Sequence, residues 1–357
     1  MEELEGSLSR IAEQLRARTE ARTLRDLETD DAPSPFALGR ISYNQFRQAM
    51  EMKQLLIEEF VDRPLNQVFE GESITNEYGS CFHLHEFRSG GLAINRRQDP
   101  RDALLAEFKL LYGIGPVVEQ SLKTEGYRTL EDLTEHPRWG NEARELLHQI
   151  RRGDLRWLQR RIGRWLSLSH PLSLKLAEML HSDDLCFFDL ESMGLFQRPI
   201  ILLGLAQPHE SGFEIHQYLA RNITEELSAL VALTEHLNRA EALVSYNGRA
   251  FDVHYVEERL AYYGIYDAQR ISRLPHFDLL HHARRTWDRL PNFRLETVES
   301  ILLGVERTID LPSALIPDFY NTYLEERNIG PLIPIIEHNR HDLISLAALF
   351  SRLCAEY

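Results

Sequence analysis

The chain contains 357 residues, which is longer than a typical single-core unit, so its length favours about two domains. Its net charge of −15, from 40 Lys and Arg residues against 55 Asp and Glu residues, argues against a protein that coats nucleic acid through bulk charge. The same charge is compatible with an enzyme that grips nucleic acid through local basic patches and holds metal ions with its own acids.

Neither a membrane span nor a disulfide framework is indicated. No apolar run approaches the roughly 20 residues that cross a bilayer, and the first residues are acidic where a signal peptide would be basic and then apolar. We therefore expect a cytoplasmic protein without a membrane partner. The three cysteines, Cys81, Cys186 and Cys354, are odd in number and far apart, which fits reduced thiols better than a disulfide or a zinc knuckle.

The first hundred residues predict helices and a small β element. Apolar residues at helical spacing predict an amphipathic helix over residues 1 to about 30, which the segment Asp30 to Pro35 cannot continue. A second helical pattern follows over residues 45–60, and residues 77–87 alternate like a strand or hairpin. His83 and His85 would share one strand face as a metal pair, but without a third ligand nearby they are better interpreted as ordinary polar strand residues.

A glycine turn at residues 113–115 suggests a phosphate-binding hairpin. Gly113 and Gly115 permit a tight turn, Pro116 suits the first turn of a helix ending near Gly126, and a second helix is predicted from Thr129. The pattern resembles the helix-hairpin-helix motif, whose turn presents backbone N–H groups to a nucleic-acid phosphate. Such hairpins also serve as plain packing units.

A run of arginines and tryptophans follows the hairpin. Arg152, Arg156 and Arg160 are spaced to lie along one side of a helix, with Trp157 and Trp165 among them. A basic stripe beside aromatic rings suits a phosphate backbone and base stacking. An exposed face paired with the surplus acids explains the same pattern, and both readings stay open.

The segment Cys186 to Gly194 is an apolar run that ends in two carboxylates and a glycine. On a strand, Asp189 and Glu191 project to the same side. Carboxylates crowded in this way raise one another's pKa unless a hard cation such as Mg²⁺ or Mn²⁺ favours their ionised forms. This spacing alone recurs by chance, so the metal hypothesis depends on the residues that follow.

The elements after this strand predict an α/β layer with active residues at strand ends. The predicted order is strands over 199–206, 212–218 and 242–246, with helices over 224–239, 252–263 and 334–346. Asn247 follows a strand, and Asp252 would open a helix beside that strand end. Asp278, at another probable strand end, is either a fifth acid near the metals or a structural hydrogen-bonding residue.

The last predicted helix carries a further acid, Asp342, together with His338. His338 and Asp342 are four residues apart, so they face the same way along an apolar stripe. An Asp on such a stripe is expensive to bury without a charged or metal partner. His341, next to Asp342, is a second histidine in reach of the same region.

In chain order, Asp189 with Glu191, Asn247 with Phe251 and Asp252, and His338 with Asp342 resemble the three motifs of the DEDD superfamily of ribonuclease-H-like 3′→5′ exonucleases. The intervening segments 277–285, 294–299 and 315–320 resemble the YprB-type ribonuclease-H-like family. This resemblance covers about residues 180 to 352, and the region ahead of it, including the helix-hairpin-helix, also looks like that of relatives.

The resemblance implies a site for two Mg²⁺ or Mn²⁺ ions. Asp189 would bridge both ions, Glu191 and Asp342 would complete one, and Asp252 would hold the other through water. His338 would be the general base or would orient the attacking water. Because three residues separate His338 from Asp342, the spacing is that of the superfamily's tyrosine branch, and His341 is a competing candidate for the base.

The predicted fold is a ribonuclease-H-like mixed sheet with flanking helices over residues 180–357, after a mostly helical region over 1–100 and a helix-hairpin-helix with a basic helix over 101–175. The predicted function is a metal-dependent 3′→5′ exonuclease on a single-stranded DNA or RNA end. The alternatives are a structure-specific endonuclease with the same site, or an inert nucleic-acid-binding protein that works through the hairpin.

Overall fold

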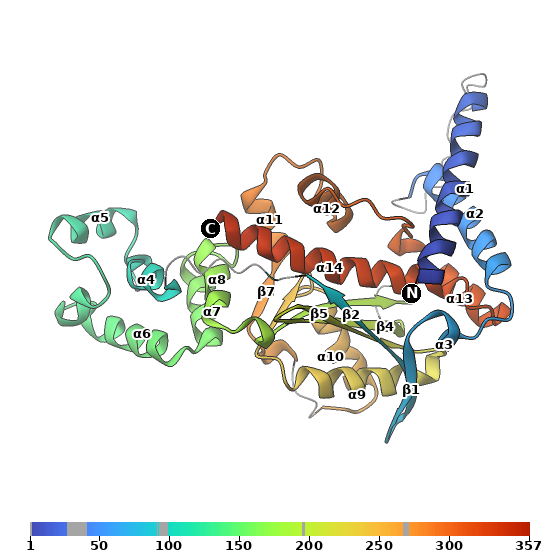
Figure 1. Ribbon diagram of the computed structural model, residues 1–357. Helices are drawn as coiled ribbons and strands as arrows, with labels where there is room; N and C mark the ends of the chain where they lie inside the picture. The colour runs from blue at the N-terminus through green and yellow to red at the C-terminus, as the bar shows by residue number, and fades with distance from the viewer. Residues whose placement is uncertain (1, 27–40, 91, 93–98, 195–196, 267–270) are drawn as a thin grey trace.

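The computed structural model describes residues 2–26, 41–90, 92, 99–194, 197–266 and 271–357 (Figure 1). The predicted linker at Asp30 to Pro35 lies outside these residues. None of the helices in the described part of the chain is long and apolar enough to cross a membrane. All three cysteines are buried and free, as the sequence predicts.

One mixed sheet organises the molecule. The strands are β1 (Gly71–Asn76), β2 (Gly79–Ser89), β3 (Leu185–Ser192), β4 (Ile200–His209), β5 (Gly212–Leu219), β6 (Ala242–Ser245) and β7 (His276–Asp278). They pair in the order β1-β2-β5-β4-β3-β6-β7. β3, β6 and β7 run parallel, whereas the pairs from β3 to β1 are antiparallel, so the predicted mixed sheet is confirmed.

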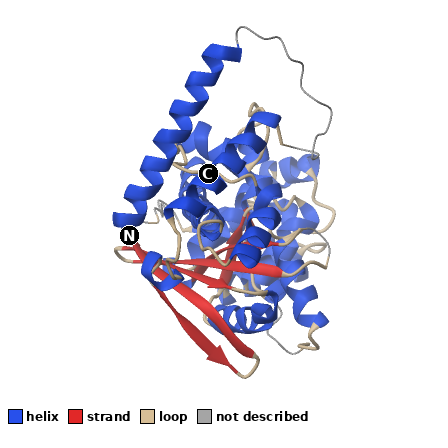
Figure 2. Cartoon of the chain, turned by 90° about the vertical axis from the view of Figure 1, so that its right-hand side faces the viewer, coloured by secondary structure: helices blue, strands red, loops and turns tan. Residues whose placement is uncertain are grey.

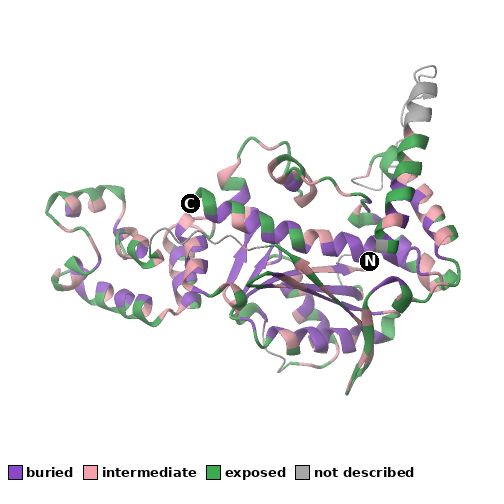
Figure 3. Ribbon diagram, viewed as in Figure 1, coloured by how far each residue is buried: buried purple, intermediate pink, exposed green. Residues whose placement is uncertain are grey.

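Helices cover both faces of this sheet. The α-helices are α1 (Glu2–Asp26), α2 (Tyr43–Glu59), α3 (Leu65–Val68), α4 (Pro100–Leu105), α5 (Pro116–Thr124), α6 (Gly140–Arg152), α7 (Leu155–Trp165), α8 (Pro171–Lys175), α9 (Glu226–Leu237), α10 (Asp252–Tyr262), α11 (Leu279–Thr286), α12 (Leu295–Leu303), α13 (Ile316–Glu326) and α14 (Leu332–Glu356). In Figure 1, α14 crosses one face of the sheet, while α9 and α10 lie against the other. Figure 3 shows that α14 is buried along most of its length.

The alternation of β3 assigns its side chains to the two faces. Phe187 packs against Phe350 of α14, with ring centroids 5.7 Å apart. Phe188 instead lies in the core shared with Leu230 of α9 and Val256 of α10. Because side chains two residues apart share a face, Asp189 and Glu191 follow Phe187 toward α14.

The N-terminal region is built into the same sheet. β1 and β2 form the predicted hairpin, and β2 pairs with β5 over eight residues from Phe82 to Ser89. Figure 2 shows this hairpin extending along one edge of the molecule. α1 and α2 share a core with α13 and the start of α14, and Lys53 of α2 contacts Asp318 of α13 at 2.7 Å. The first hundred residues therefore share their core with the C-terminal region.

The helical region before β3 differs from the prediction in two places. The helix expected from Thr129 is wrong: a 3₁₀ helix at Asp132–Glu135 comes first, and α6 begins only at Gly140. The Asp132 carboxylate accepts the backbone N–H groups of Arg128 and Thr129 in a turn. Pro137 then holds His136 in an extended conformation (ψ 130°), which ends the 3₁₀ helix.

The basic helix is two helices. Gly153 adopts a left-handed conformation (φ 70°) that ends α6, and Asp154 begins α7 by accepting the backbone N–H of Trp157 at 3.0 Å. Arg152 therefore lies at the end of α6, and only Arg156 and Arg160 share a helix. The prediction that all three lie along one helix is wrong.

Candidate functional site

Three elements bring the four predicted carboxylates together beside the end of β3. Asp189 and Glu191 project from β3, Asp252 is the first residue of α10 directly after β6, and Asp342 lies on α14. Each of the three other acids faces Asp189 closely enough for its negative charge to act on it. The structure thus gathers acids that are as many as 153 positions apart in the sequence, from Asp189 to Asp342.

A close approach of α14 to the sheet makes this arrangement possible. Gly204 of β4 lies opposite Asp189, and a Cβ atom at this glycine would lie only 2.1 Å from the side-chain oxygen of Asn339. The amide of Asn339 donates to Asp189 Oδ2 at 2.8 Å and accepts from Gln217 at 2.8 Å. Any side chain at residue 204 would displace the Asn339 amide and disturb its hydrogen bond to Asp189.

Asn339 was missed by the sequence analysis. It is fully buried, and its amide is the hydrogen-bond donor that the structure gives to Asp189. Asn339 lies in the polar stretch from Glu337 to Asp342, and nothing in that stretch distinguishes it as the partner of Asp189. Its partners on β3 and β5 could not be read from the sequence, since they come from other elements.

Burial and mutual repulsion hold the carboxyl groups toward their neutral forms. Burial, followed by the charges of Asp342 and Glu191, raises the pKa of Asp189 well above its usual value. Burial raises the pKa of Glu191 to about 8 and that of Asp252 to about 7. Raised carboxyl pKa values in one cluster are the electrostatic signature of a cation site or a catalytic site.

His338 lies inside the cluster. Its Nε2 is 3.8 Å from Glu191 Oε1 and 3.7 Å from Asp342 Oδ2. Burial opposes its charge, but Asp342, Asp310 and Glu191 together raise the pKa of His338 to about 10. In contrast, burial lowers the pKa of His341 to about 4, and no hydrogen bond or ion pair of His341 occurs within the described residues.

An arginine borders the cluster on one side. Arg307 pairs with Asp342 and with the buried Glu299, which also accepts from Ser345. Its guanidinium also lies 3.1 Å from His338 Nδ1. Among the four predicted acids, Arg307 pairs with Asp342 alone within the described residues, so it lies at the edge of the cluster and not between Asp189, Glu191 and Asp252.

The donor set fits divalent hard cations. Four carboxyl groups, of which Asp189, Glu191 and Asp252 have raised pKa values, supply the oxygen ligands that Mg²⁺ and Mn²⁺ prefer. In the described part of the chain, the only three potential ligand side chains within 4.8 Å of one another are elsewhere, at His85, Glu214 and His216. No three of the four acids, all of them within the described residues, offer ligand atoms that lie within that distance of one another.

Asp278 has a structural role, and its charge also contributes to the raised pKa of Asp252. Its carboxylate caps α11 by accepting from the backbone N–H of Leu280 at 3.2 Å, and it also accepts from the N–H groups of Asn247 at 2.8 Å and Arg249 at 3.2 Å. Asn247 adopts a left-handed conformation (φ 66°), so the loop turns directly toward Asp252. Asp278 therefore shapes the loop that leads into α10.

The glycine turn has the predicted local geometry. Gly113 is left-handed (φ 78°), and Gly115 precedes α5 without any side-chain cap for the first N–H groups of the helix. Tyr112 and Val117 on either side are largely exposed. The turn therefore presents unsatisfied backbone donors to solvent, as helix N-termini do.

The arginines divide into two groups. Arg161 points inward, donates to the carbonyl of Leu110 at 2.7 Å and pairs with Glu142. Arg152, Arg156 and Arg160 are exposed, and no acid of the described chain pairs with any of them. The reading in which these three are neutralised by the surplus acids is therefore wrong.

Residues 186–354 match the RNase_H superfamily, and they form a domain of that superfamily. The YprB protein of Bacillus subtilis (strain 168) is 34% identical to this chain over 190 residues. The match covers 51% of this chain and 44% of that protein, so the chain spans less than half of its relative.

Among solved structures, the chain is similar to the family B DNA polymerase from the hyperthermophilic archaeon Pyrobaculum calidifontis. The two share 16% sequence identity with a TM-score of 0.38, over 47% of this chain and 24% of that chain.

Proposed function

We propose that this protein is a divalent-metal-dependent nuclease that removes nucleotides from the 3′ end of a single-stranded DNA or RNA. The observation that supports the proposal is the convergence of Asp189, Glu191, Asp252 and Asp342, the first three of which have raised pKa values. Burying these acids together is costly unless a cation compensates their charge.

The acids have separate roles in this proposal. Asp189 would take part in holding both Mg²⁺ or Mn²⁺ ions, Glu191 and Asp342 would hold one of them, and Asp252 would hold the other through water. Two such ions supply a nucleophile from water at neutral pH and stabilise the leaving oxygen of a phosphodiester. Asn339 fixes the orientation of Asp189 by its hydrogen bond.

His338 handles the proton. While the carboxylates are uncompensated, its raised pKa keeps it protonated at neutral pH, and it holds a proton toward Glu191 and Asp342. It becomes a proton acceptor only when the surrounding negative charge is neutralised. We propose His338 over His341 for this role, because only His338 contacts the acids.

The helical region before β3 would bind the nucleic-acid strand. The open N–H groups at the start of α5 would bind a phosphate in the manner of a helix-hairpin-helix, and Arg152, Arg156 and Arg160 would add a basic surface. Asn247, in the loop before Asp252, would contact the terminal nucleotide. This part of the proposal is separate from the chemistry and can fail without it.

The test uses oligonucleotides of DNA and RNA labelled at either end, with purified protein and Mg²⁺ or Mn²⁺. A 5′-labelled strand should shorten stepwise, a 3′-labelled strand should release the label at once, and chelation should stop both reactions. Asp189→Ala should abolish cleavage. Asp183→Ala, an exposed acid away from the cluster, should not change it.

Circular single strands separate the two cleavage modes. An exonuclease leaves them intact, whereas nicking of circles with the same metal and the same Asp189 dependence would replace the exonuclease with an endonuclease. Undiminished degradation by Asp189→Ala would show that the acidic cluster is not the active site.

A second candidate function rests on Arg307. Because this arginine already pairs with Asp342 and Glu299, it compensates part of the charge that a metal would otherwise compensate. The corresponding function is nucleic-acid binding through the α5 hairpin without cleavage. It predicts binding that survives chelation and the Asp189→Ala, Asp252→Ala double change, together with no degradation under any metal.

A further inference from the structure

Histidines gather on the face of the sheet opposite to the acids. His85 of β2 stands directly across from His216 of β5, and Glu214 stands two residues along the same strand. Ligand atoms from these three side chains all lie within 4.8 Å of one another. The sequence predicted that His83 and His85 share a face without a third ligand, and the strand pairing supplies that ligand from 130 residues away.

Hydrogen bonds already orient the central imidazole. His83 Nε2 lies 3.1 Å from His216 Nδ1, so one ring nitrogen of His216 is engaged. The other, Nε2, lies 3.6 Å from Glu214 Oε2. A histidine whose second nitrogen is held by a neighbouring group is the usual arrangement of a metal ligand.

A fourth side chain stands beside the same oxygen. Nε2 of His209, at the end of β4, lies 3.2 Å from Glu214 Oε2. The rings of His85 and His216 are stacked with centroids 4.7 Å apart, so a small rotation of the accessible His85 ring directs its nitrogen toward the same point. His216 itself is buried and anchored, which leaves the other side chains to adjust around it.

We propose that His85, Glu214 and His216 form a second metal site, which binds one Zn²⁺ or a similar transition-metal ion, with His209 or water in the fourth position. Two imidazoles and one carboxylate with an open position are a zinc donor set, and imidazole selects such ions over Mg²⁺.

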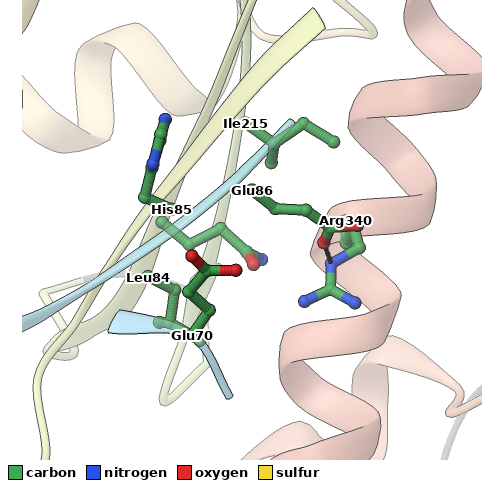
Figure 4. Close-up of a pocket in the computed structure, with 7 residues that line it drawn as sticks. Glu70, Leu84, His85, Glu86, Ile215 and Arg340 are labelled. Carbon is green, nitrogen blue, oxygen red and sulfur yellow. Dashed lines mark ion pairs between the residues drawn. The ribbon is translucent and has the colours of Figure 1, made fainter. Parts of the chain in front are cut away.

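This site is separate from the acidic cluster. Figure 4 shows Glu86 directed toward Arg340 of α14, whereas the ring of His85 extends away from that helix. Asp189 lies on the α14 side, opposite Gly204, whereas His216 pairs with Leu205 on the α9 side. The sheet itself lies between the two sets of ligands.

The ion would fasten the N-terminal hairpin to the nuclease sheet. β2 belongs to the first hundred residues and β5 to the ribonuclease-H-superfamily domain, and the proposed ligands join these two strands. Such a site stabilises the folded chain by mass action, since the separated strands cannot bind the ion with the same ligands.

The test is calorimetric titration of the full-length chain with ZnCl₂ in an Asp189→Asn, Asp252→Asn background, which disables the acidic cluster. One Zn²⁺ should bind per chain. His85→Ala should weaken binding by more than about 100-fold, since even losing a supporting contact costs about 10- to 100-fold. Glu214→Gln, which keeps the size of the side chain, should weaken it as well.

The matched control is His148→Ala, an exposed histidine on α6, which should bind Zn²⁺ like the parent. Co²⁺ in place of Zn²⁺ should give a visible absorption spectrum of nitrogen ligation that His85→Ala loses. Equal Zn²⁺ affinity in parent and His85→Ala, or binding that disappears with the acidic cluster, overturns the proposal. None of these readouts involves nuclease activity, so they are independent of the proposed function.

Discussion

Burial shifts the pKa values of the groups on the two faces of the sheet in opposite directions. On the α14 face, burial raises the pKa values of Asp189 and Glu191, so these acids resist ionisation. On the α9 face, burial lowers the pKa of His216 to about 3 and that of His236 to about 4, so these bases resist protonation. Low polarity disfavours charge of either sign.

The difference teaches what each face can bind. Acids that repel one another need a compensating charge, which suits a small hard cation with oxygen ligands. Neutral imidazoles need no such charge, and they offer nitrogen lone pairs to a softer ion. Without metal, the acids of the first face therefore repel one another. The imidazoles of the second face already make ring-stacking contacts and hydrogen bonds.

The largest expected effect separates activity from stability on the acidic face. We expect Asp252→Asn to slow cleavage by about 10³-fold, because losing a metal ligand removes several kcal/mol of transition-state stabilisation. The same change should stabilise the metal-free protein by about 1 kcal/mol, because it removes a buried negative charge. Initial rates and urea unfolding midpoints measure the two effects. A loss of both activity and stability would contradict this account.

The next effect concerns the arginine at the edge of that face. Arg307→Gln leaves Glu299 and Asp342 buried without their cation, so we expect a loss of about 3–5 kcal/mol in the free energy of unfolding. Urea denaturation measures it. The control is Arg63→Gln, which removes an exposed pair with Glu3 and should cost at most about 1 kcal/mol.

A smaller effect tests the close approach of α14. In Gly204→Ala, the added methyl group meets the Asn339 amide, so α14 must move, at a cost of about 1–3 kcal/mol. Because Asp342 moves with that helix, the Mg²⁺ dependence of cleavage should shift to higher concentration. An unchanged Mg²⁺ dependence would mean that α14 does not need this contact to position its acid.

Each face of the sheet affects stability in a different pH range: the acidic face above pH 7 (the alkaline limb) and the histidines below pH 6.5 (the acid limb). Above pH 7, Glu191 and His338 bind more protons in the folded than in the unfolded chain, since their pKa values are raised to about 8 and about 10. The free energy of unfolding should therefore fall as pH rises from 7 to 9, by roughly 1 kcal/mol per pH unit. Mg²⁺ should flatten this limb, and Glu191→Gln should reduce it without metal.

Below pH 6.5 the histidines of the α9 face contribute to a loss of stability. The lowered pKa values of His216 and His236 mean that the unfolded chain binds more protons, so stability should fall as pH drops from 6.5 toward 4. Zn²⁺ should reduce the loss of stability below pH 6.5 and leave the pH dependence of stability above pH 7 unchanged. Thermal unfolding at a series of pH values, with each metal in turn, measures both. If one ion stabilised the protein equally in both pH ranges, the claim that the two faces bind different ions would be wrong.

The smallest effect is a single hydrogen bond on the imidazole face. Tyr218→Phe removes the contact at 2.8 Å between its hydroxyl and Nδ1 of His236, so we expect a loss of about 1 kcal/mol in the free energy of unfolding. The fold and the acidic face should be unaffected, which unchanged cleavage would verify.

Much of the architecture could be predicted from local pattern. The strand at Asp189, the hairpin of β4 and β5, the helix that opens at Asp252 and the helix with His338 and Asp342 were all predicted from periodicity, caps and turns. Periodicity works there because each element buries one continuous apolar face. It failed at Gly153, where equal spacing of arginines continued across a helix end.

The sequence by itself determined which residues carry charge and which elements hold them. Only the tertiary structure decided that Asn339 reaches Asp189, that Arg307 borders Asp342, and that His216 stands across from His85. The physical reason is that strand pairing and helix packing join residues more than a hundred positions apart. Such contacts depend on shape and register, whereas a sequence pattern reports only the near neighbours along the chain.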